Sequence, residues 1–462
     1  MSVRARSLAV EEIAGEWPLI GALMGGTTAM RAAGKQYLPQ WPNEPDDPYK
    51  ARLSTATLFP AFGRTVDVLA AKPFSHPVTV SDDTPARVRE WCGDIDLQGR
   101  DLHAFAGALF RSGMAYGIAG ILVDYPQVGG IRTAAEERAA GVRPYFVEIA
   151  ARCILGWRSS RINGAEVLTQ LRFIETVYEA DGPFAEKEIE QVRVLTPGAW
   201  QTWRKDESAT TDDKWRLHAE GITTLRKIPF VPVYGHRTGM MRGVSPLNEL
   251  AHMNVEHWQS KSDQQTILHV ARVPILFGRN LGATQIVVGG ASAVVADGDN
   301  ADLKFVEHSG AAIEAGRLSL LDLEDRMRQV GAELLVIKPG NTSITQTIAD
   351  NEPAMCALQR MAHDLQTALT GALNLMAEWV GEQPAGHVEV FKDFGVSSLA
   401  EASLSLLREM TTAGQFSAES LFHEAKRRGV VQAGLTWAEE RDRIASERKA
   451  HEAAEGDDAD ED

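Results

Sequence analysis

Hydrophobic positions follow helical spacing in three long stretches between residues 245 and 380. The first stretch, Ser245–Ala271, has apolar ends and a polar middle that runs from Gln259 to Thr266. The second, about Gly316–Leu335, repeats apolar residues at intervals of three and four. The third runs from Asn351 to about Val380. Its apolar stripe comprises Met355, Leu358, Ala362, Leu365, Leu369, Leu373 and Met376. We therefore predict three long helices, the last with Asn351 as N-cap and Pro353 in its first turn.

A β-rich insert separates the first two helices. Short strands are predicted at Pro274–Phe277, Gln285–Val288, Ala293–Ala296 and Leu303–Val306, with turns at Gly289-Gly290 and Asp297–Asn300. Two long helices around such an insert make a poor closed core by themselves. The pattern favours rods that are buried by copies of the same chain in a ring. For the third rod, periodicity alone also allows a core helix of a compact domain. In that arrangement, the polar middle of the first rod faces the channel and the neighbouring subunit.

The N-terminal half mixes helices with antiparallel strands. Helices are predicted over residues 11–35 with an interruption at Gly25-Gly26, over 49–71, and over 102–116; four prolines exclude a helix between 36 and 49. A buried strand follows at Gly117–Val123. From 145 to 236 the period changes to two, which predicts a meander. Its strands are Ile154–Arg158, Val167–Glu179, Ile189–Leu195, Ala199–Lys205, Trp215–Ala219 and Val231–Tyr234. The fold class is α+β, because no helices alternate with these strands.

The chain ends in helical and acidic sequence. A strand at Val388–Phe391 precedes predicted helices at Ser398–Ala413, Ser417–Gly429 and Thr436–Ala454. The net charge is −16, and the last eleven residues hold seven acids without Lys or Arg, so we expect residues 455–462 to be disordered. An acidic body argues against tight DNA binding, which needs clustered Lys and Arg, but not against letting DNA pass. No run of about 18 apolar residues predicts a membrane span, and the N-terminus does not resemble a secretory signal.

Signals for catalysis or cofactors are weak. Residues 21–28 approach a phosphate-binding loop, but Thr27 replaces the lysine and no strand precedes it, so a helix interruption is the better interpretation. His252 and His257 are five apart and cannot share a metal on one helix face; a surface or inter-subunit position is expected. Glu324-Asp325 and Asp212-Asp213 are interpreted as solvated carboxylates. The three cysteines lie far apart and predict neither disulfides nor zinc. Four tryptophans in the meander (157, 200, 203, 215) are expected to pack in the core and at sheet edges. We expect no cofactor, no metal and no enzymatic activity.

Several short runs, in order, resemble one protein family. They are Arg31 with Gln36–Pro39, Tyr49–Leu53, Gly117–Pro126, Pro144-Tyr145, Ile154–Arg158 and Gly243–Leu247. Together they are similar to portal proteins of tailed bacteriophages, in a subgroup formerly described as a domain of unknown function. The resemblance covers residues 30–445. It implies a portal fold assembled as a ring, with wing, stem, clip and crown regions.

The resemblance also implies boundaries. They are wing 1–244, stem helix 245–271, clip 272–309, second stem helix 310–335, tunnel-loop region 336–350, long helix and wing return 351–397, crown 398–454 and acidic tail 455–462. Expected tunnel-loop residues beside DNA are Lys338, Asn341, Thr342, Ser343, Thr345, Gln346 and Thr347. Expected clip residues in contact with the packaging motor or adaptor are Arg279, Asn280, Asp297, Asp299, Asn300 and Asp302.

The implied function is a passive channel at one capsid vertex through which double-stranded DNA is packaged and ejected. Implied partners are further copies of the chain, typically as a dodecamer, the terminase large subunit, head-completion or adaptor proteins, and major capsid and scaffolding proteins, but no membrane. The expected location is the virion, with assembly in the host cytoplasm. If acids line the bore, phosphates are repelled over about 8 Å at physiological salt and DNA slides in water. Alternatives are another ring-forming head–tail connector that binds no terminase, or a soluble α+β enzyme acting on nucleotides.

Overall fold

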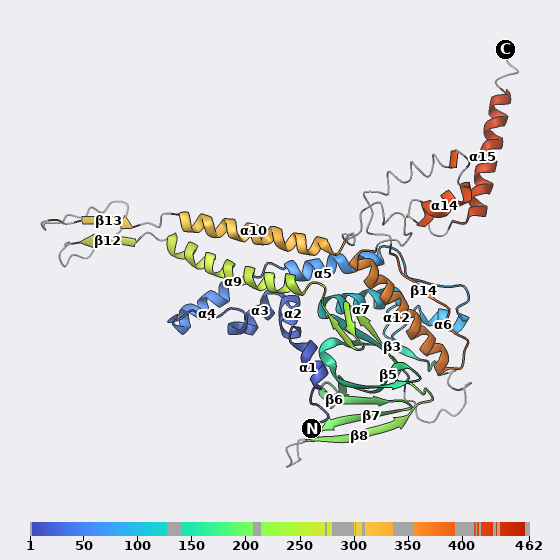
Figure 1. Ribbon diagram of the computed structural model, residues 1–462, viewed down its shortest axis with the longest axis horizontal. Coiled ribbons are helices and arrows are strands. Elements are labelled where there is room, and N and C mark those ends of the chain that lie inside the picture. The colour runs from blue at the N-terminus through green and yellow to red at the C-terminus, as the bar shows by residue number, and fades with distance from the viewer. Residues whose placement is uncertain are drawn as a thin grey trace. The chain divides into compact units, whose positions relative to one another are not determined.

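The computed structural model divides the chain into two compact units, Met1–Phe391 and Lys392–Asp462. It describes residues 2–126, 136, 140–206, 214–272, 275–279, 300, 302–306, 310–335, 355–392, 411–412, 414, 417–427, 431 and 435–457. The first unit combines helices with antiparallel sheets, as predicted from the change of hydrophobic period (Figure 1). The mixed α+β class is therefore confirmed, whereas a ring is not tested by a single chain.

Short helices open the first unit. They are α1 (Leu8–Ala14), α2 (Trp17–Met24), α3 (Gly26–Ala33), the 3₁₀ turn η1 (Gly34–Gln36), α4 (Asp46–Thr55), α5 (Ala61–Ala71) and η2 (Lys72–Phe74). The interruption at Gly25-Gly26 is confirmed, although the predicted helix over 11–35 is split once more, near Gly15. The single helix over 49–71 was wrong. Residues 56–60 separate α4 from α5, because Pro60 cannot donate a backbone hydrogen bond and restricts the residue before it.

A three-stranded sheet forms the centre of this unit. Strand β2 (Ile118–Asp124) lies between β3 (Tyr145–Ala150) and β9 (Phe230–Tyr234), and all neighbours are antiparallel. Helix α7 (Leu102–Tyr116) packs on β2, and the indole of Trp17 donates to the Tyr116 carbonyl at 3.1 Å. The strand predicted at 117–123 is thus confirmed and central. The strand at 231–234 belongs to this sheet and not to the meander, which is a correction.

The meander is a separate five-stranded sheet. Its strands, in spatial as well as chain order, are β4 (Ile154–Ile162), β5 (Ala165–Ala180), β6 (Glu186–Thr196), β7 (Ala199–Lys205) and β8 (Trp215–Ile222). Asn163 and Gly164 connect β4 to β5 with φ angles of 51° and 82°, as a two-residue hairpin turn with two positive φ angles requires. Trp157 and Trp200 pack on the main core and Trp203 and Trp215 on a smaller cluster, so the packing interpretation of the four tryptophans is confirmed. Two further pairs are β10 (His236–Gly239) with β11 (Arg242–Val244) and β1 (Thr79–Val80) with β14 (Val388–Glu389). In chain order, α6 (Ala86–Trp91) lies between β1 and β2, and η3 (Ala151–Cys153) lies between β3 and β4.

Helix α12 (Ala357–Trp379) is buried by its own chain. Its apolar stripe, including Leu358, Leu365 and Leu373, packs against β2, β9, α6 and α7. The side chains of Gln366, Thr370 and Asn374 accept hydrogen bonds from backbone N–H groups of the returning segment 385–390. The expectation that neighbouring copies bury this rod was therefore wrong. The helix also begins later than predicted, with Cys356 as N-cap; Met355 lies before it and is exposed, and Asn351 and Pro353 lie outside the described residues.

Two described helices form the second unit. Helix α14 (Ala418–Arg427) is preceded by Ser417, whose hydroxyl accepts from the Ser420 backbone N–H at 3.0 Å, and α15 (Trp437–Asp457) follows. Phe422 and Trp437 pack ring against ring at 5.4 Å and join the two helices. Helix α15 continues to Asp457, three residues beyond the predicted end at Ala454, and residues 458–462 of the predicted acidic tail lie outside the described residues. The helix predicted at 398–413 falls almost entirely outside the described residues.

Candidate functional site: the helical arm and its arginine clamp

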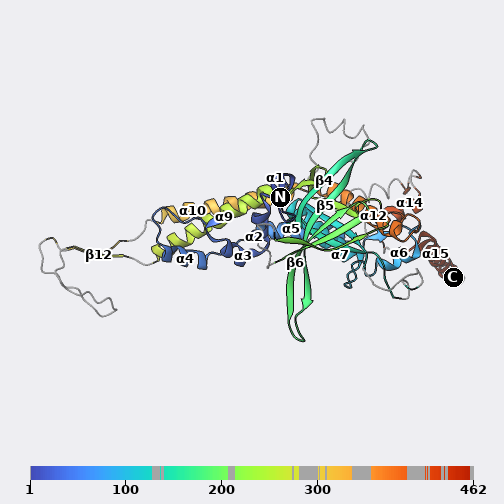
Figure 2. The same cartoon turned by 90° about the horizontal axis from the view of Figure 1, so that it is seen from below.

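A helical hairpin with a β tip forms what we call the arm. It consists of α9 (Asn248–Ala271), β12 (Ile275–Arg279), β13 (Asp302–Val306) and α10 (Ala311–Glu333). The two helices lie side by side in both views and contact each other along their length (Figures 1 and 2). Each spans about 35 Å at 1.5 Å per residue. β12 pairs with β13 beyond their ends, so the predicted helix–strand–strand–helix order is confirmed for the described residues.

The polar middle of α9 has partners within the chain. The Gln264 amide donates to the Ile313 carbonyl of α10 at 2.7 Å, and the Gln259 amide donates to the Tyr37 carbonyl at 3.0 Å. Ser262 and Gln264 are both buried. Part of this stretch is therefore covered by α10 and the N-terminal segment of its own chain, and the placement of its half-buried residues beside a channel or a second subunit stays a prediction.

His257 is one of these buried groups. Its Nε2 lies 3.2 Å from a Glu324 carboxyl oxygen on α10, and its side chain is 1% exposed. Burial lowers the pKa of His257 below its ordinary value, and the Glu324 carboxylate opposes this shift only in part. The predicted surface position was therefore wrong for His257, and Glu324 is less solvated than expected. His252, by contrast, lies at the surface, 3.2 Å from Glu16.

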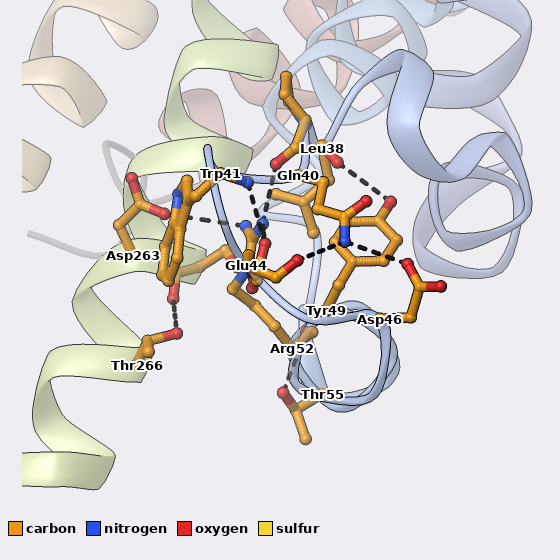
Figure 3. Close-up of polar contacts among 12 residues, drawn as sticks. Leu38, Gln40, Trp41, Glu44, Asp46, Tyr49, Arg52, Thr55, Asp263 and Thr266 are labelled. Atoms are coloured by element: carbon orange, nitrogen blue, oxygen red, sulfur yellow. Dashed lines mark hydrogen bonds and ion pairs between the residues drawn. The ribbon is translucent and has the colours of Figure 1, made fainter.

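A buried arginine joins the N-terminal segment to α9 (Figure 3). The Arg52 guanidinium donates twice to the Glu44 carboxylate, at 3.0 and 2.8 Å, and once to the Pro39 carbonyl at 2.8 Å. It also lies 4.2 Å from the centre of the Trp41 ring and 3.9 Å from an Asp263 carboxyl oxygen of α9. We call Arg52, Glu44, Trp41 and Asp263 the arginine clamp.

Charge and burial shift the pKa values of the two carboxylates in this clamp. The Arg52 side chain is 4% exposed and that of Glu44 is 5% exposed. The hydrogen bond from Arg52 holds the pKa of Glu44 below its ordinary value. Burial raises the pKa of Asp263, which accepts a hydrogen bond from the Trp41 side chain. The bidentate geometry is one that lysine cannot reproduce, so position 52 requires arginine.

A second contact fixes the base of the arm. The Asn254 side chain of α9 accepts from the Phe62 backbone N–H at 2.9 Å and donates to the Phe59 carbonyl at 2.8 Å. Both backbone groups flank the start of α5, where a helix leaves donors without partners. One buried amide from a distant part of the chain thus serves as the cap of α5 and holds α9 against it.

The outer surface of α10 remains uncovered. Among its described residues only Leu323, Met327 and Gly331 are fully buried. Leu318 and Leu321 are 48% and 43% exposed, and Ile267 on α9 is 37% exposed. Leu320 and Val330, from the predicted stripe, are half-buried. The arm therefore leaves large apolar side chains in contact with water in the isolated chain.

Most of the predicted site residues lie outside the described parts of the structure. This holds for all seven tunnel-loop residues from Lys338 to Thr347 and for Asn280, Asp297 and Asp299 of the predicted clip. Arg279 is exposed on β12 and its Cα lies opposite that of Asp302 on β13. Asn300 adopts a left-handed conformation with φ of 61°, as expected for a turn. The strands predicted at 285–288 and 293–296 also lie outside the described residues.

The described residues carry no metal-binding group of three or more His, Cys, Asp or Glu side chains. Burial raises the pKa of Cys92 to about 11 and also raises that of Cys153, which leaves these thiols protonated at neutral pH. The partial phosphate-binding motif at residues 21–28 covers the end of α2 and the start of α3, and the Thr27 hydroxyl in α3 accepts from the Leu58 backbone N–H at 3.1 Å. Within the described helices, none is long and apolar enough to cross a membrane.

Sequence reasoning missed the role of the arginine clamp. The run Tyr49–Leu53 was noticed as part of the family resemblance, but nothing in its spacing pointed to a partner on α9 more than two hundred residues later. The available signal is indirect: Trp41 and Glu44 lie among four prolines, and Arg52 follows the last of these prolines by four residues.

Comparison with known proteins gives limited matches. A family model described as a domain of unknown function, DUF4055, matches residues 246–380, which span the arm and α12. No curated protein matches the chain. A solved chain of a native gene transfer agent particle has a TM-score of 0.41 and 14% identity, covering 79% of this chain and 88% of that one.

Two further solved chains come from necks of such particles. The neck of the native particle, computed with C12 symmetry, gives a TM-score of 0.41 and 15% identity over 78% of this chain and 88% of that one. The neck of the empty particle, computed with C6 symmetry, gives 0.41 and 14% over the same shares. The chain is thus similar, at low identity and low TM-score, to solved chains of gene transfer agent particles.

Proposed function

We propose that this chain is a phage portal protein: copies form a ring at one capsid vertex, and double-stranded DNA passes through it during packaging and ejection. The chain itself is a passive conduit and assembly centre, and ATP hydrolysis belongs to a terminase that docks on the tip of the arm. Adaptor and capsid proteins contact other surfaces of the ring.

The uncovered face of the arm carries this proposal. A surface helix normally places its large apolar residues against its own core, yet Leu318 and Leu321 of α10 are about half exposed. Full burial of an exposed leucine contributes about 1.5–3 kcal/mol, so covering the exposed half of each of these side chains would contribute about 1 kcal/mol. Repeated around a ring, each α10 would gain this burial from the next copy. The arginine clamp and the Asn254 amide support the proposal by fixing α9 at its base, so that repeated arms keep one angle.

The charge of the chain supports passage rather than binding. At a net charge of −16 per copy, a ring repels DNA phosphates wherever its acids face the bore, and salt limits this repulsion to about 8 Å. The predicted tunnel-loop residues, Lys338 among them, would meet phosphates without reading sequence.

The first test is assembly. Mass photometry of the purified chain should show a species near twelve times 50.4 kDa, and electron micrographs should show a holed ring. Leu318→Ser combined with Leu321→Ser should abolish the ring and leave the melting temperature of the monomer nearly unchanged. Leu8→Ser in α1, where the leucine is 76% exposed, is the matched control and should assemble normally. A wild-type chain that stays monomeric at every concentration would refute the proposal.

The second test separates a portal from a connector that binds no terminase. The ring should capture the terminase large subunit, and Arg279→Glu on β12 or Asp299→Lys in the predicted clip should abolish capture while rings persist. Rings that capture no terminase would favour the connector.

A further inference from the structure

The two ends of strand β5 belong to hairpins of opposite charge. It is 16 residues long, or about 53 Å at 3.3 Å per residue, and spans the meander from the β4–β5 turn to the β5–β6 loop. The strands of this sheet reach out on two opposite sides of α7 (Figure 2). One end of β5 is therefore far from the other, and each end is part of a hairpin.

The β5–β6 end is a two-stranded ribbon. Residues 176–180 pair with 186–190 only, because β4 pairs with β5 no further than Phe173 and β7 pairs with β6 from Gln191 onward. We call residues 176–190 the acidic ribbon. An isolated two-stranded ribbon is marginally stable in water. A ribbon of this length is therefore expected to have a partner that covers it.

The tip of the acidic ribbon carries an aromatic side chain among acids. Phe184 is 100% exposed and Tyr178 is 66% exposed. The loop is closed by a hydrogen bond from the Asp181 N–H to the Ala185 carbonyl at 2.8 Å and by Gly182 with φ of 83°, so the turn itself does not require a phenylalanine. The ribbon has five acids and one lysine.

Three of these acids are available for a partner. Glu179 and Glu190 form ion pairs with Arg204 and Arg4, at 2.6 and 2.9 Å. Asp181, Glu186 and Glu188 are exposed, and no described residue forms an ion pair with them. A phenylalanine with a rim of charge is a typical anchor of a protein interface.

The opposite end of β5 is basic. Arg158 and Arg161 are exposed on β4, and no described residue forms an ion pair with either; Arg172 on β5 lies opposite Gly156, near Arg158. Ile162, next to the turn, is 49% exposed. We call residues 158–164 the basic hairpin. Burial lowers the pKa of Arg172, and the proximity of Arg158 adds to this shift. Nearer the turn, the exposed Glu166 of β5 lies opposite Arg161 and accepts a hydrogen bond from the Ser159 hydroxyl at 2.6 Å, so this end of the sheet carries two exposed arginines against one carboxylate.

We propose that the acidic ribbon of one copy docks on the basic hairpin of the next copy, with Phe184 packing beside Ile162. The inference rests on the proposed ring and names one of its contacts. It follows from complementary charge at opposite ends of one rigid sheet: a surface that fits the opposite end of an identical molecule makes a head-to-tail contact, and such contacts close into rings when the rotation allows. A contact of this kind also differs from the one formed by the arm, so each copy would be held at two places.

The test is a pair of charge reversals mixed together. The ribbon variant carries Asp181→Lys, Glu186→Lys and Glu188→Lys; the hairpin variant carries Arg158→Glu and Arg161→Glu. Each alone places like charges at every contact and should lower the fraction of chain in rings at least about tenfold, since like-charge contacts cost several kcal/mol. Mixed in equal amounts, the variants should restore rings, because reversed ribbons meet reversed hairpins and native ribbons meet native hairpins. Native mass spectrometry should then find both variants in equal numbers.

A control pair of charge reversals on α15 and a Phe184 variant complete the test of this contact. Glu447→Lys with Arg443→Glu, both exposed on α15 in the other unit, should leave rings unchanged. Phe184→Ser should weaken rings while circular dichroism of the monomer stays the same. Rings formed by either variant alone at the wild-type level, or no rescue on mixing, would overturn this contact and leave the portal proposal standing. A wild-type chain that forms no ring would overturn both.

Discussion

Replacing Arg52 by methionine tests the arginine clamp most directly. Methionine fills similar volume but leaves the Glu44 carboxylate, 5% exposed, without its main partner. Removing one member of a buried ion pair costs about 3–5 kcal/mol, because the remaining charge stays buried without compensation. We therefore expect the segment around residues 37–55 to detach from α9 far more often.

The effect should be measured as local opening. Hydrogen exchange of peptides from residues 37–55 should accelerate between about a hundredfold and several thousandfold, at 1.36 kcal/mol per factor of ten. Adding Glu44→Leu to Arg52→Met should restore most of the protection, since a buried pair replaced by apolar residues is often nearly neutral. Unchanged exchange in the single variant, or losses that simply add in the double variant, would refute the assigned role of the pair.

The dependence on pH gives an independent check. In the wild type, Arg52 holds the pKa of Glu44 below its ordinary value, so the pair stabilises the fold above the unfolded pKa and its contribution is lost as pH falls through the folded pKa. Without Arg52, burial should raise that pKa above the unfolded value, and the cost should disappear once the carboxyl is protonated. The difference between variant and wild type should therefore shrink from neutral pH towards about pH 4.

Three further predictions concern single positions. Because burial lowers the pKa of His257, the unfolded chain binds a proton before the folded one does; stability should fall as pH drops below about 6.5, and His257→Gln should flatten this fall in thermal melts. Gly316→Ala should destabilise the arm by about 1–2 kcal/mol in urea melts, since its Cβ would lie 2.1 Å from Gln264 Oε1 and break a buried hydrogen bond. The control Gly371→Ala meets no atom within 4 Å and should stabilise α12 by about 0.5–1 kcal/mol. Thr436→Ala removes the hydroxyl that caps α15 and should cost about 0.5–2 kcal/mol of helix stability, read by circular dichroism.

Local patterns predicted the elements of this fold well. The meander was predictable because alternation and the turn Asn163-Gly164 set both period and register. The long helices were predictable because their apolar spacing extends over many turns. Helix boundaries were predicted wrongly where the N-cap residue is unusual. Cys356 is the N-cap of α12, and its N–H donates to Gln359 Oε1, whereas the sequence predicts Asn351, a more common N-cap residue.

Long-range contacts could not be predicted in the same way. From sequence alone, the polar middle of α9 suggests a position beside a channel. Nothing in the sequence shows that the Gln259 amide donates to the Tyr37 carbonyl or that the Gln264 amide donates to the Ile313 carbonyl. The same limit applies to α12, whose stripe predicts burial but not by which chain. In the sequence, the acidic ribbon is recognisable only as acidic residues around a turn. It is exposed because β4 and β7 are shorter than β5 and do not extend alongside it.

The contact between Tyr37 and Gln259 also cannot form until late in synthesis of the chain. These residues are 222 positions apart, and at about 5–20 residues per second the ribosome needs roughly 10–45 s to deliver the second after the first. During that interval Arg52 has no α9 to pack on, and the start of α5 lacks the Asn254 amide. Until α9 has been synthesised, the N-terminal helices therefore lack these stabilising contacts. Chaperones would have the longest access to these helices during this interval, before the nascent chain reaches its final third.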